Sequence, residues 1–232
     1  MDIFNLSLKM IILLEENMEV CSVYPEKRLS FPDAEAKLTW LSRLLDAYSI
    51  VDQGVDEGIS KEISTNARAL ACKKGCASCC RIHAAVPIYP LEMAGMAWYC
   101  TEQVDGEERE LLAAQLENFQ EGQPCPFLVH DVCGIHALRP MACRQFNVFD
   151  TPCAEDEDPF YNRREDVFTP LDSYKNKAFW VTLPFYGITD ERDKEIAINE
   201  NHIHRQVRVL QQCNWKELAK KMRLFDAQRK LG

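Results

Sequence analysis

The sequence predicts a mainly α protein, in which helical flanks surround an irregular, cysteine-rich metal-binding module with at most a short β-hairpin. Two observations lead to this prediction. Apolar residues in the flanks recur at the three- and four-residue spacing of amphipathic helices. Nine of the 11 cysteines lie between Cys72 and Cys153, a local density typical of metal modules or disulfide scaffolds.

The length suits one compact domain made of three regions. A chain of 232 residues is long enough for one large domain, or for one domain with a small appendage. We expect an N-terminal helical flank over residues 1–70 and a cysteine-rich metal-binding module over residues 71–153. A C-terminal flank of loop and helix is expected over residues 154–232.

The N-terminal flank is expected to be helical. One face of a helix is lined by Leu41, Leu44, Leu45, Tyr48, Val51, Val55, Ile59 and Ile63. Ser30, two residues before a proline, is the expected start. Gly54 and Gly58 interrupt the pattern and predict a bend or a close contact with another helix. A shorter helix is expected over residues 3–18.

The remaining elements are expected to be short. In chain order they are helices over residues 91–102 and 107–120, a hairpin within 125–135, a helical turn over 136–145 and a polar loop over 150–166. The hairpin prediction rests on apolar residues that flank the pair His130-Asp131. An amphipathic helix beginning near Trp215 should end the chain, because apolar residues again recur every three or four positions.

Charge and hydropathy limit the classes of partner. The chain has 27 basic and 36 acidic residues, a net charge of −9, which repels phosphate backbones, so we expect no nucleic-acid partner. The longest apolar runs, Met10–Leu14 and Met96–Cys100, are five residues long. A membrane helix needs roughly 20 residues, so no membrane association is expected. The first residues lack a secretory pattern, and we therefore expect a cytoplasmic protein with reduced thiols.

The first group of cysteines has the pattern Cys72-x3-Cys76-x2-Cys79-Cys80. Four thiols within nine residues converge only if the backbone curls tightly, which Gly75 permits. Binding to a cation would stabilise such a curl. Neighbouring side chains diverge by about 100° on a helix, so Cys79 and Cys80 are unlikely partners on one mononuclear ion. The easier geometry has two sites sharing this segment, or one site and a structural thiol.

The second group consists of Cys125, Cys133, Cys143 and Cys153. Together the two groups supply eight thiols, the number needed for two centres with four thiolates each. A single centre that draws on both groups is equally allowed. The spacing alone does not decide which thiols share a metal.

Basic residues lie close to these cysteines in a chain that is acidic overall: Lys73, Lys74, Arg81, Arg139 and Arg144. A tetrathiolate centre is negatively charged, and nearby cations and N–H donors must offset that charge. We therefore expect Arg139 and Arg144 to lie near the bound group. The alternative is that these are ordinary surface bases.

Disulfides are a weaker interpretation of the same cysteines, because nothing in the sequence marks secretion. Cys21, Cys100 and Cys213 each stand apart from the groups and are expected to be ordinary core or surface residues. His83, three residues after Cys80, is a weaker candidate ligand.

The order of these residues resembles the YkgJ-type cysteine-cluster family, described as a zinc- or iron-chelating domain. The resemblance covers about residues 70–145 and includes the first cysteine group, then Cys-Pro-Phe-Leu at Cys125, Cys-x-Ile at Cys133 and Arg-Pro-x-x-Cys-Arg at 139–144. His136 stands where the family usually has tyrosine, and Cys153 lies past the shared blocks. The resemblance implies metal or iron–sulfur binding and no defined reaction.

We therefore expect a metal-binding protein with a structural, electron-transfer or accessory role and no identified protein partner. An iron–sulfur cluster is slightly favoured over zinc, because zinc modules usually have paired Cys-x2-Cys knuckles and the second group is widely spaced. The alternative is an enzyme that uses a [4Fe–4S] cluster for methyl transfer or radical chemistry. Cys72, Cys76 and Cys79 have the spacing of radical S-adenosylmethionine enzymes, and flagellin lysine methylases have a related cysteine cluster, although no methyl-donor motif is found here.

Overall fold

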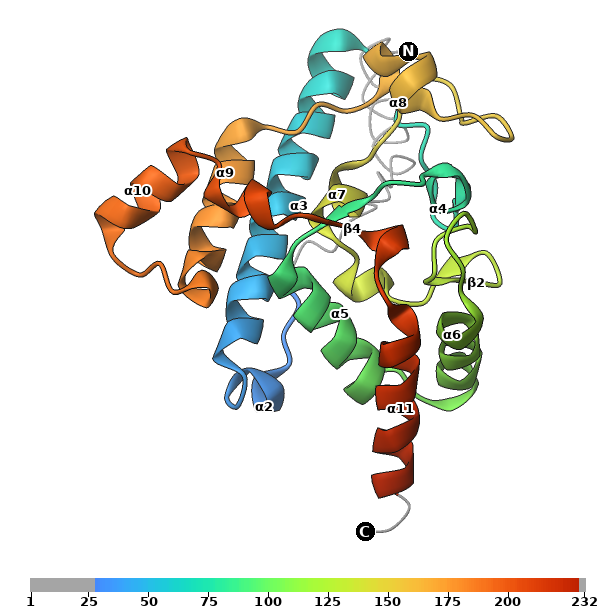
Figure 1. The fold of residues 1–232 in the computed structure, drawn as a ribbon. Coiled ribbons are helices and arrows are strands. Elements are labelled where there is room, and N and C mark those ends of the chain that lie inside the picture. The colour runs from blue at the N-terminus through green and yellow to red at the C-terminus, as the bar shows by residue number, and fades with distance from the viewer. Residues whose placement is uncertain (1–27, 230–232) are drawn as a thin grey trace, which may run out of the picture.

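The computed structural model describes residues 28–229, and this part of the chain is mainly helical (Figure 1). The α-helices are α2 (Pro32–Glu35), α3 (Thr39–Asn66), α4 (Ser78–Ile82), α5 (Pro90–Glu102), α6 (Gly106–Asn118), α7 (Met141–Gln145), α8 (Pro159–Asn162), α9 (Asp172–Thr182), α10 (Glu191–Asn199) and α11 (Trp215–Arg229). The 3-10 helices are η1 (His136–Leu138), η2 (Arg164–Asp166), η3 (Leu183–Tyr186), η4 (His202–Gln206) and η5 (Leu210–Gln212). The predicted fold class is confirmed.

Two small antiparallel sheets accompany the helices. The strands β2 (Leu128–Val129) and β3 (Val132–Cys133) form the predicted hairpin. Its turn residues His130 and Asp131 have φ values of 48° and 62°, the left-handed conformation that a tight two-residue hairpin turn requires. The pairing of β1 (Pro87–Ile88) with β4 (Arg208–Val209) was not predicted, because two-residue strands leave no readable pattern.

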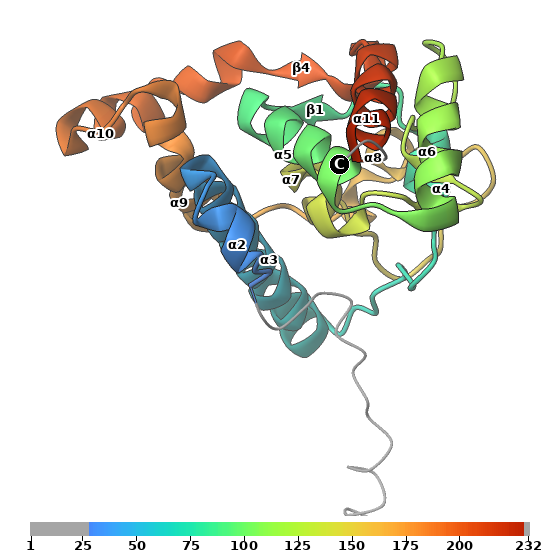
Figure 2. The same ribbon diagram turned by 90° about the horizontal axis from the view of Figure 1, so that it is seen from below.

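The long helix α3 forms one side of the molecule with α9 against it, as Figure 2 shows from below. Its predicted stripe is buried from Leu41 to Ile59, whereas Ile63 is 44% exposed. The expected single helix from Ser30 is instead divided, because the chain forms α2 first and begins α3 only at Thr39. The helix expected over residues 3–18 lies outside the described residues.

The glycines in α3 mark a close contact, one of the two outcomes that the sequence predicts. A Cβ atom on Gly54 would lie 2.6 Å from the Cβ and Cγ of Tyr174. A Cβ atom on Gly58 would lie 2.4 Å from the Cε2 of Phe168. The absence of side chains at these two glycines therefore lets α3 approach α9 and the segment that leads into it.

Gly58→Ala is expected to destabilise the protein by about 1–3 kcal/mol, the usual cost of forcing extra atoms into a packed core. The expected result is a lower unfolding midpoint in a denaturant titration with an unchanged slope. Gly134→Ala is the matched control, because a Cβ atom there would meet its neighbours at ordinary contact distances of 3.5 Å or more. Equal effects of the two substitutions would contradict the packing explanation.

The other side of the molecule is built from α5, α6 and α11 (Figure 2). Two hydrophobic clusters occur in the described residues, and α5 contributes to both. Leu91 and Trp98 pack with α3 and α9, whereas Met96 and Cys100 pack with α6, α11 and the hairpin. The predicted helices in this half are confirmed, with small shifts at their ends.

The polar segment after residue 150 is more ordered than the expected loop, since it contains the short helices α8 and η2. Helices α9 and α10 were not predicted at all. α10 lies beyond α9 at one edge of the molecule (Figure 1) and has a single buried residue, Ala197. In the described part of the chain, no helix is both long and apolar enough to cross a membrane.

Candidate metal centre

Four stretches of the chain meet beside α4 and bring the predicted ligands together. They are residues 72–80, the hairpin, α7 and the loop after α7. The backbone N–H of Cys125 donates to the carbonyl of Cys80 at 2.7 Å, which joins the segment just before the hairpin to α4. The N–H of Val148 donates to the Sγ of Cys72 at 3.3 Å, which joins the loop to the first cysteine. Segments distant in sequence are thus fixed next to one another.

Three of the thiols form an outer group, defined as Cys72, Cys76 and Cys153. Burial raises the pKa of the Cys72 thiol to about 11, and the nearby thiols of Cys76 and Cys153 act in the same direction. Burial also raises the pKa of Cys153, again with a contribution from Cys76. Cys76 itself is exposed. One edge of the outer group therefore reaches the protein surface.

Four thiols form an inner group, defined as Cys80, Cys125, Cys133 and Cys143. A side-chain hydrogen bond with Cys125 is the main cause that raises the pKa of Cys80 to about 12. Burial raises the pKa of Cys143 well above its ordinary value, and the thiols of Cys133 and Cys80 add to this effect. The four thiols of the inner group are thus neighbours, and each of these cysteines is partly buried.

Cys79 lies between the two groups. Its side chain is hydrogen-bonded to Cys80, and the thiol of Cys76 also acts on it. Cys79 in turn raises the pKa of Cys143, after the larger effect of burial. The adjacent thiols of Cys79 and Cys80 thus remain in contact and face different neighbours, which agrees with a segment shared between two sites.

The spatial grouping differs from the order along the chain. Cys80 belongs with the hairpin cysteines, and Cys153 belongs with Cys72 and Cys76. Sequence spacing placed these two residues in the opposite groups. The difference arises because the contact between Cys125 and Cys80 draws the end of the first group toward the hairpin.

The donor set fits a soft metal ion or an iron–sulfur cluster. Neighbouring thiols raise the pKa of Cys72, Cys79 and Cys143, and a bound cation would reverse this effect by favouring the thiolates. Among residues 28–229, no three cysteine, histidine or acidic side chains stand at metal-ligand spacing. The thiols would therefore have to draw closer together to bind an ion.

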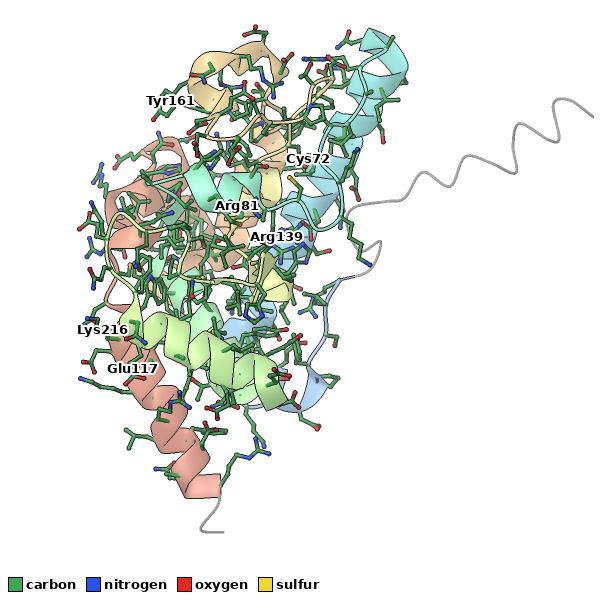
Figure 3. The ribbon with its side chains drawn as sticks, turned by 90° about the vertical axis from the view of Figure 1, so that its right-hand side faces the viewer. Cys72, Arg81, Glu117, Arg139, Tyr161 and Lys216 are labelled. Carbon is green, nitrogen blue, oxygen red and sulfur yellow. The ribbon has the colours of Figure 1, made fainter. Side chains whose placement is uncertain are left out.

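The two predicted arginines lie next to the inner group, and Figure 3 shows Arg139 on the same side of the molecule as Cys72 and Arg81. Burial raises the pKa of Cys133, and the positive charges of Arg139 and Arg144 act in the opposite direction. Both bases are therefore placed to favour a thiolate. Arg81 is exposed, and it pairs with Asp131 in the hairpin turn at 2.7 Å.

Arg144 also holds the backbone around the inner group. It is 1% exposed. Its Nε donates to the carbonyl of Arg139 at 2.9 Å, and its Nη2 donates to the carbonyl of Ala137 at 2.5 Å. The guanidinium carbon lies 4.1 Å from the centre of the Tyr48 ring. Arg144 thus stabilises the backbone next to the inner group, and it also supplies a nearby positive charge.

An ionic network anchors the loop that contains Cys153. Arg68 at the end of α3 pairs with Asp150 at 2.8 Å, and it also pairs with Asp166. Arg163 pairs with Glu157 at 2.8 Å, which closes the loop on itself. These contacts hold both ends of the loop, so Cys153 stays near the outer group.

His83, Cys100 and Cys213 belong to neither of the two thiol groups. The Nε2 of His83 lies 3.4 Å from a carboxylate oxygen of Asp158, and burial lowers the pKa of this histidine. Cys100 is fully buried in the core, and Cys213 directs its thiol to the carbonyl of Val209 at 3.4 Å. Cys21 lies outside the described residues.

Sequence reasoning missed two buried acidic residues near the inner group. Asp52 in α3 is 7% exposed and pairs with Arg144, and Glu92 in α5 is 1% exposed and accepts a hydrogen bond from the N–H of Met141. Asp52 lies among the apolar positions of its helix. Glu92 lies three residues after the N-cap of α5, the position of a capping-box acid. Each of these positions could have indicated a buried or capping acid from the sequence alone.

Comparison with known proteins finds one similarity, which covers this region. Residues 71–167 match the family model CxxCxxCC, described as "Putative zinc- or iron-chelating domain". The match extends past Cys143 and includes Cys153, which the resemblance seen in the sequence left outside. Searches of curated proteins and of solved structures found no match. The cysteine-rich centre of this chain is thus similar to the CxxCxxCC family over residues 71–167.

Proposed function

We propose that this chain binds metal through eight thiolates: Cys72, Cys76, Cys79, Cys80, Cys125, Cys133, Cys143 and Cys153. The observation that supports the proposal most strongly is the convergence of these thiols from four separate segments into two adjoining groups. Thiols crowded without a ligand gain nothing from the arrangement, whereas thiolates around a cation gain much. Arg139 and Arg144 would offset part of the resulting negative charge.

The bound group in this proposal is an iron–sulfur cluster, with zinc as the alternative. Every donor is a thiolate, and the inner group is assembled from α4, the segment before β2, β3 and α7 rather than from paired knuckles. Cys79, in contact with both groups, would join two neighbouring centres or extend one of them. A reducing compartment, which we take to be the cytoplasm, would keep the thiols available.

The role that we propose is structural, electron-transferring or accessory. The exposed Cys76 places one edge of the outer group at the surface, which suits electron exchange or contact with a partner. An enzyme of the radical S-adenosylmethionine type gains no support from residues 28–229, because their sheets are pairs of two-residue antiparallel strands rather than strand–helix units.

Metal and sulfide analysis of the full chain, purified without oxygen, tests the proposal. We expect a brown protein that contains iron and acid-labile sulfide in similar amounts. Stoichiometric zinc without iron or sulfide would contradict the cluster and keep the metal site. Full-length folded protein without either metal would contradict the proposed function itself.

A further inference from the structure

The helix that contains Cys143 is too short to hold its own position. α7 has five residues, from Met141 to Gln145, and isolated helices of this length are unstable in water. Cys143 lies at the middle of this helix. The place of its thiol in the inner group therefore depends on contacts that other elements make with α7.

Two buried carboxylates hold α7, one near each end. The Oε1 of Glu92 in α5 accepts a hydrogen bond from the N–H of Met141, the first residue of α7, at 2.7 Å. The Oδ2 of Asp52 in α3 accepts a hydrogen bond from the Nη1 of Arg144 at 2.6 Å. The short helix is thus tied to the two long helices that flank it.

The carboxylate of Glu92 accepts hydrogen bonds at the N-termini of two helices. Its Oε2 accepts a hydrogen bond from the N–H of Tyr89, the N-cap residue of α5, at 3.0 Å. Its other oxygen is bound to the first N–H of α7. Negative charge is favourable at a helix N-terminus, and a buried N–H left without an acceptor is costly. This carboxylate therefore fixes where α7 begins relative to α5.

We infer that Glu92 is a positioning residue of the metal centre, which clamps α5 to α7 so that Cys143 meets the other inner thiols. The inference rests on the proposed function, because it assigns Glu92 an effect on metal affinity. Glu92 is not proposed as a ligand, since both of its oxygens accept hydrogen bonds from backbone N–H groups. It acts through the position of α7.

If Glu92 acted through its charge, replacing it would change the metal affinity in the opposite direction. Its negative charge raises the pKa of the nearby Cys143 thiol and so disfavours the thiolate. If charge dominated, the neutral Glu92→Gln variant would bind metal more tightly. If position dominates, the same variant binds less tightly, because the amide group retains one acceptor oxygen in place of two.

Titration of Co²⁺ into the reduced full-length chain, against a competing chelator, measures this effect. The thiolate-to-cobalt absorption reports binding, and circular dichroism confirms that each variant is folded at the working temperature. We expect Glu92→Gln to weaken Co²⁺ binding about 10-fold and Glu92→Leu up to about 100-fold, the range seen when groups that support metal ligands are removed. Glu92→Gln decides the test if the leucine variant does not fold.

Two controls separate positioning from general destabilisation. Arg109 is also buried but joins α6 to α11 through hydrogen bonds to Asp226 and to the carbonyl of Met222. Arg109→Leu should lower stability and leave Co²⁺ affinity unchanged. In a Cys143→Ser background, Glu92→Gln should cause no further loss of affinity, because its effect passes through Cys143.

The outcomes distinguish this inference from the proposed function. Wild-type protein that binds no Co²⁺ would overturn both. Wild-type protein that binds Co²⁺ with the same affinity as Glu92→Gln, or less tightly, would overturn the positioning role alone. Equal losses in the Cys143→Ser and wild-type backgrounds would also overturn it.

Discussion

Cys143→Ser is expected to release most of the bound metal and to destabilise the centre of the molecule. Burial raises the pKa of the Cys143 thiol well above its ordinary value, and its neighbours include Cys79, Cys80 and Cys133. Its loss would therefore remove a proposed ligand at the point where the segments meet. Serine is a poor replacement, because its hydroxyl does not ionise near neutral pH and zinc and iron–sulfur centres prefer thiolates.

The expected loss of stability in Cys143→Ser follows from the coupling of metal binding to folding. Binding free energies at structural zinc sites are about 10–16 kcal/mol. If the substitution forfeits about 4 kcal/mol of this, the Tm falls by roughly 8–16 °C for a chain of this size. Metal content and Tm of the purified variant, measured together, check the prediction.

Cys213→Ser is the matched control for this experiment. Cys213 is partly buried, as Cys143 is, and its thiol donates to the backbone carbonyl of Val209. We expect full metal content and a Tm close to that of the unsubstituted protein. Equal losses from the two substitutions would show that the assignment of Cys143 is wrong.

Arg144→Leu is expected to cost about 3–5 kcal/mol, the typical result of breaking a buried ion pair by removing one partner. The substitution leaves the carboxylate of Asp52 buried, and the other oxygen of Asp52 has no hydrogen-bond partner in the described structure. It also frees two backbone carbonyls before α7. Equilibrium unfolding in urea, with metal content recorded, measures the loss.

Two further variants test the explanation. Arg223→Leu removes an exposed ion pair with Glu110 and should cost less than about 1 kcal/mol. Asp52→Leu combined with Arg144→Leu should recover part of the lost stability, because the uncompensated charge is gone. A double variant that is less stable than Arg144→Leu would contradict the ion-pair account.

The elements with strong periodicity were predictable from sequence, and the weakly amphipathic ones were not. α3 packs against α9, so its buried positions are apolar and recur at helical spacing from Leu41 to Ile59. That regular spacing made the helix predictable. α10 escaped prediction because only Ala197 is buried along it. The hairpin was predictable because His130-Asp131 fits a tight turn between apolar residues.

The ligand candidates were readable in the sequence, whereas their grouping was not. Residue type and spacing mark the eight cysteines. Which thiols lie together depends on long-range contacts, such as the hydrogen bond between Cys125 and Cys80. Glu92 and Asp52 were missed for the same reason, since their importance comes from partners in α7.

Residue-resolved alkylation of the thiols tests the central claim most directly. The folded, metal-loaded full-length chain is treated with a thiol reagent before and after a chelator removes the metal, and mass spectrometry locates the modified cysteines. We predict that the eight cysteines from Cys72 to Cys153 named above become reactive on metal removal, while the reactivity of Cys213 stays unchanged. An unchanged pattern at Cys76 and Cys143 would contradict the claim that these thiols hold the metal.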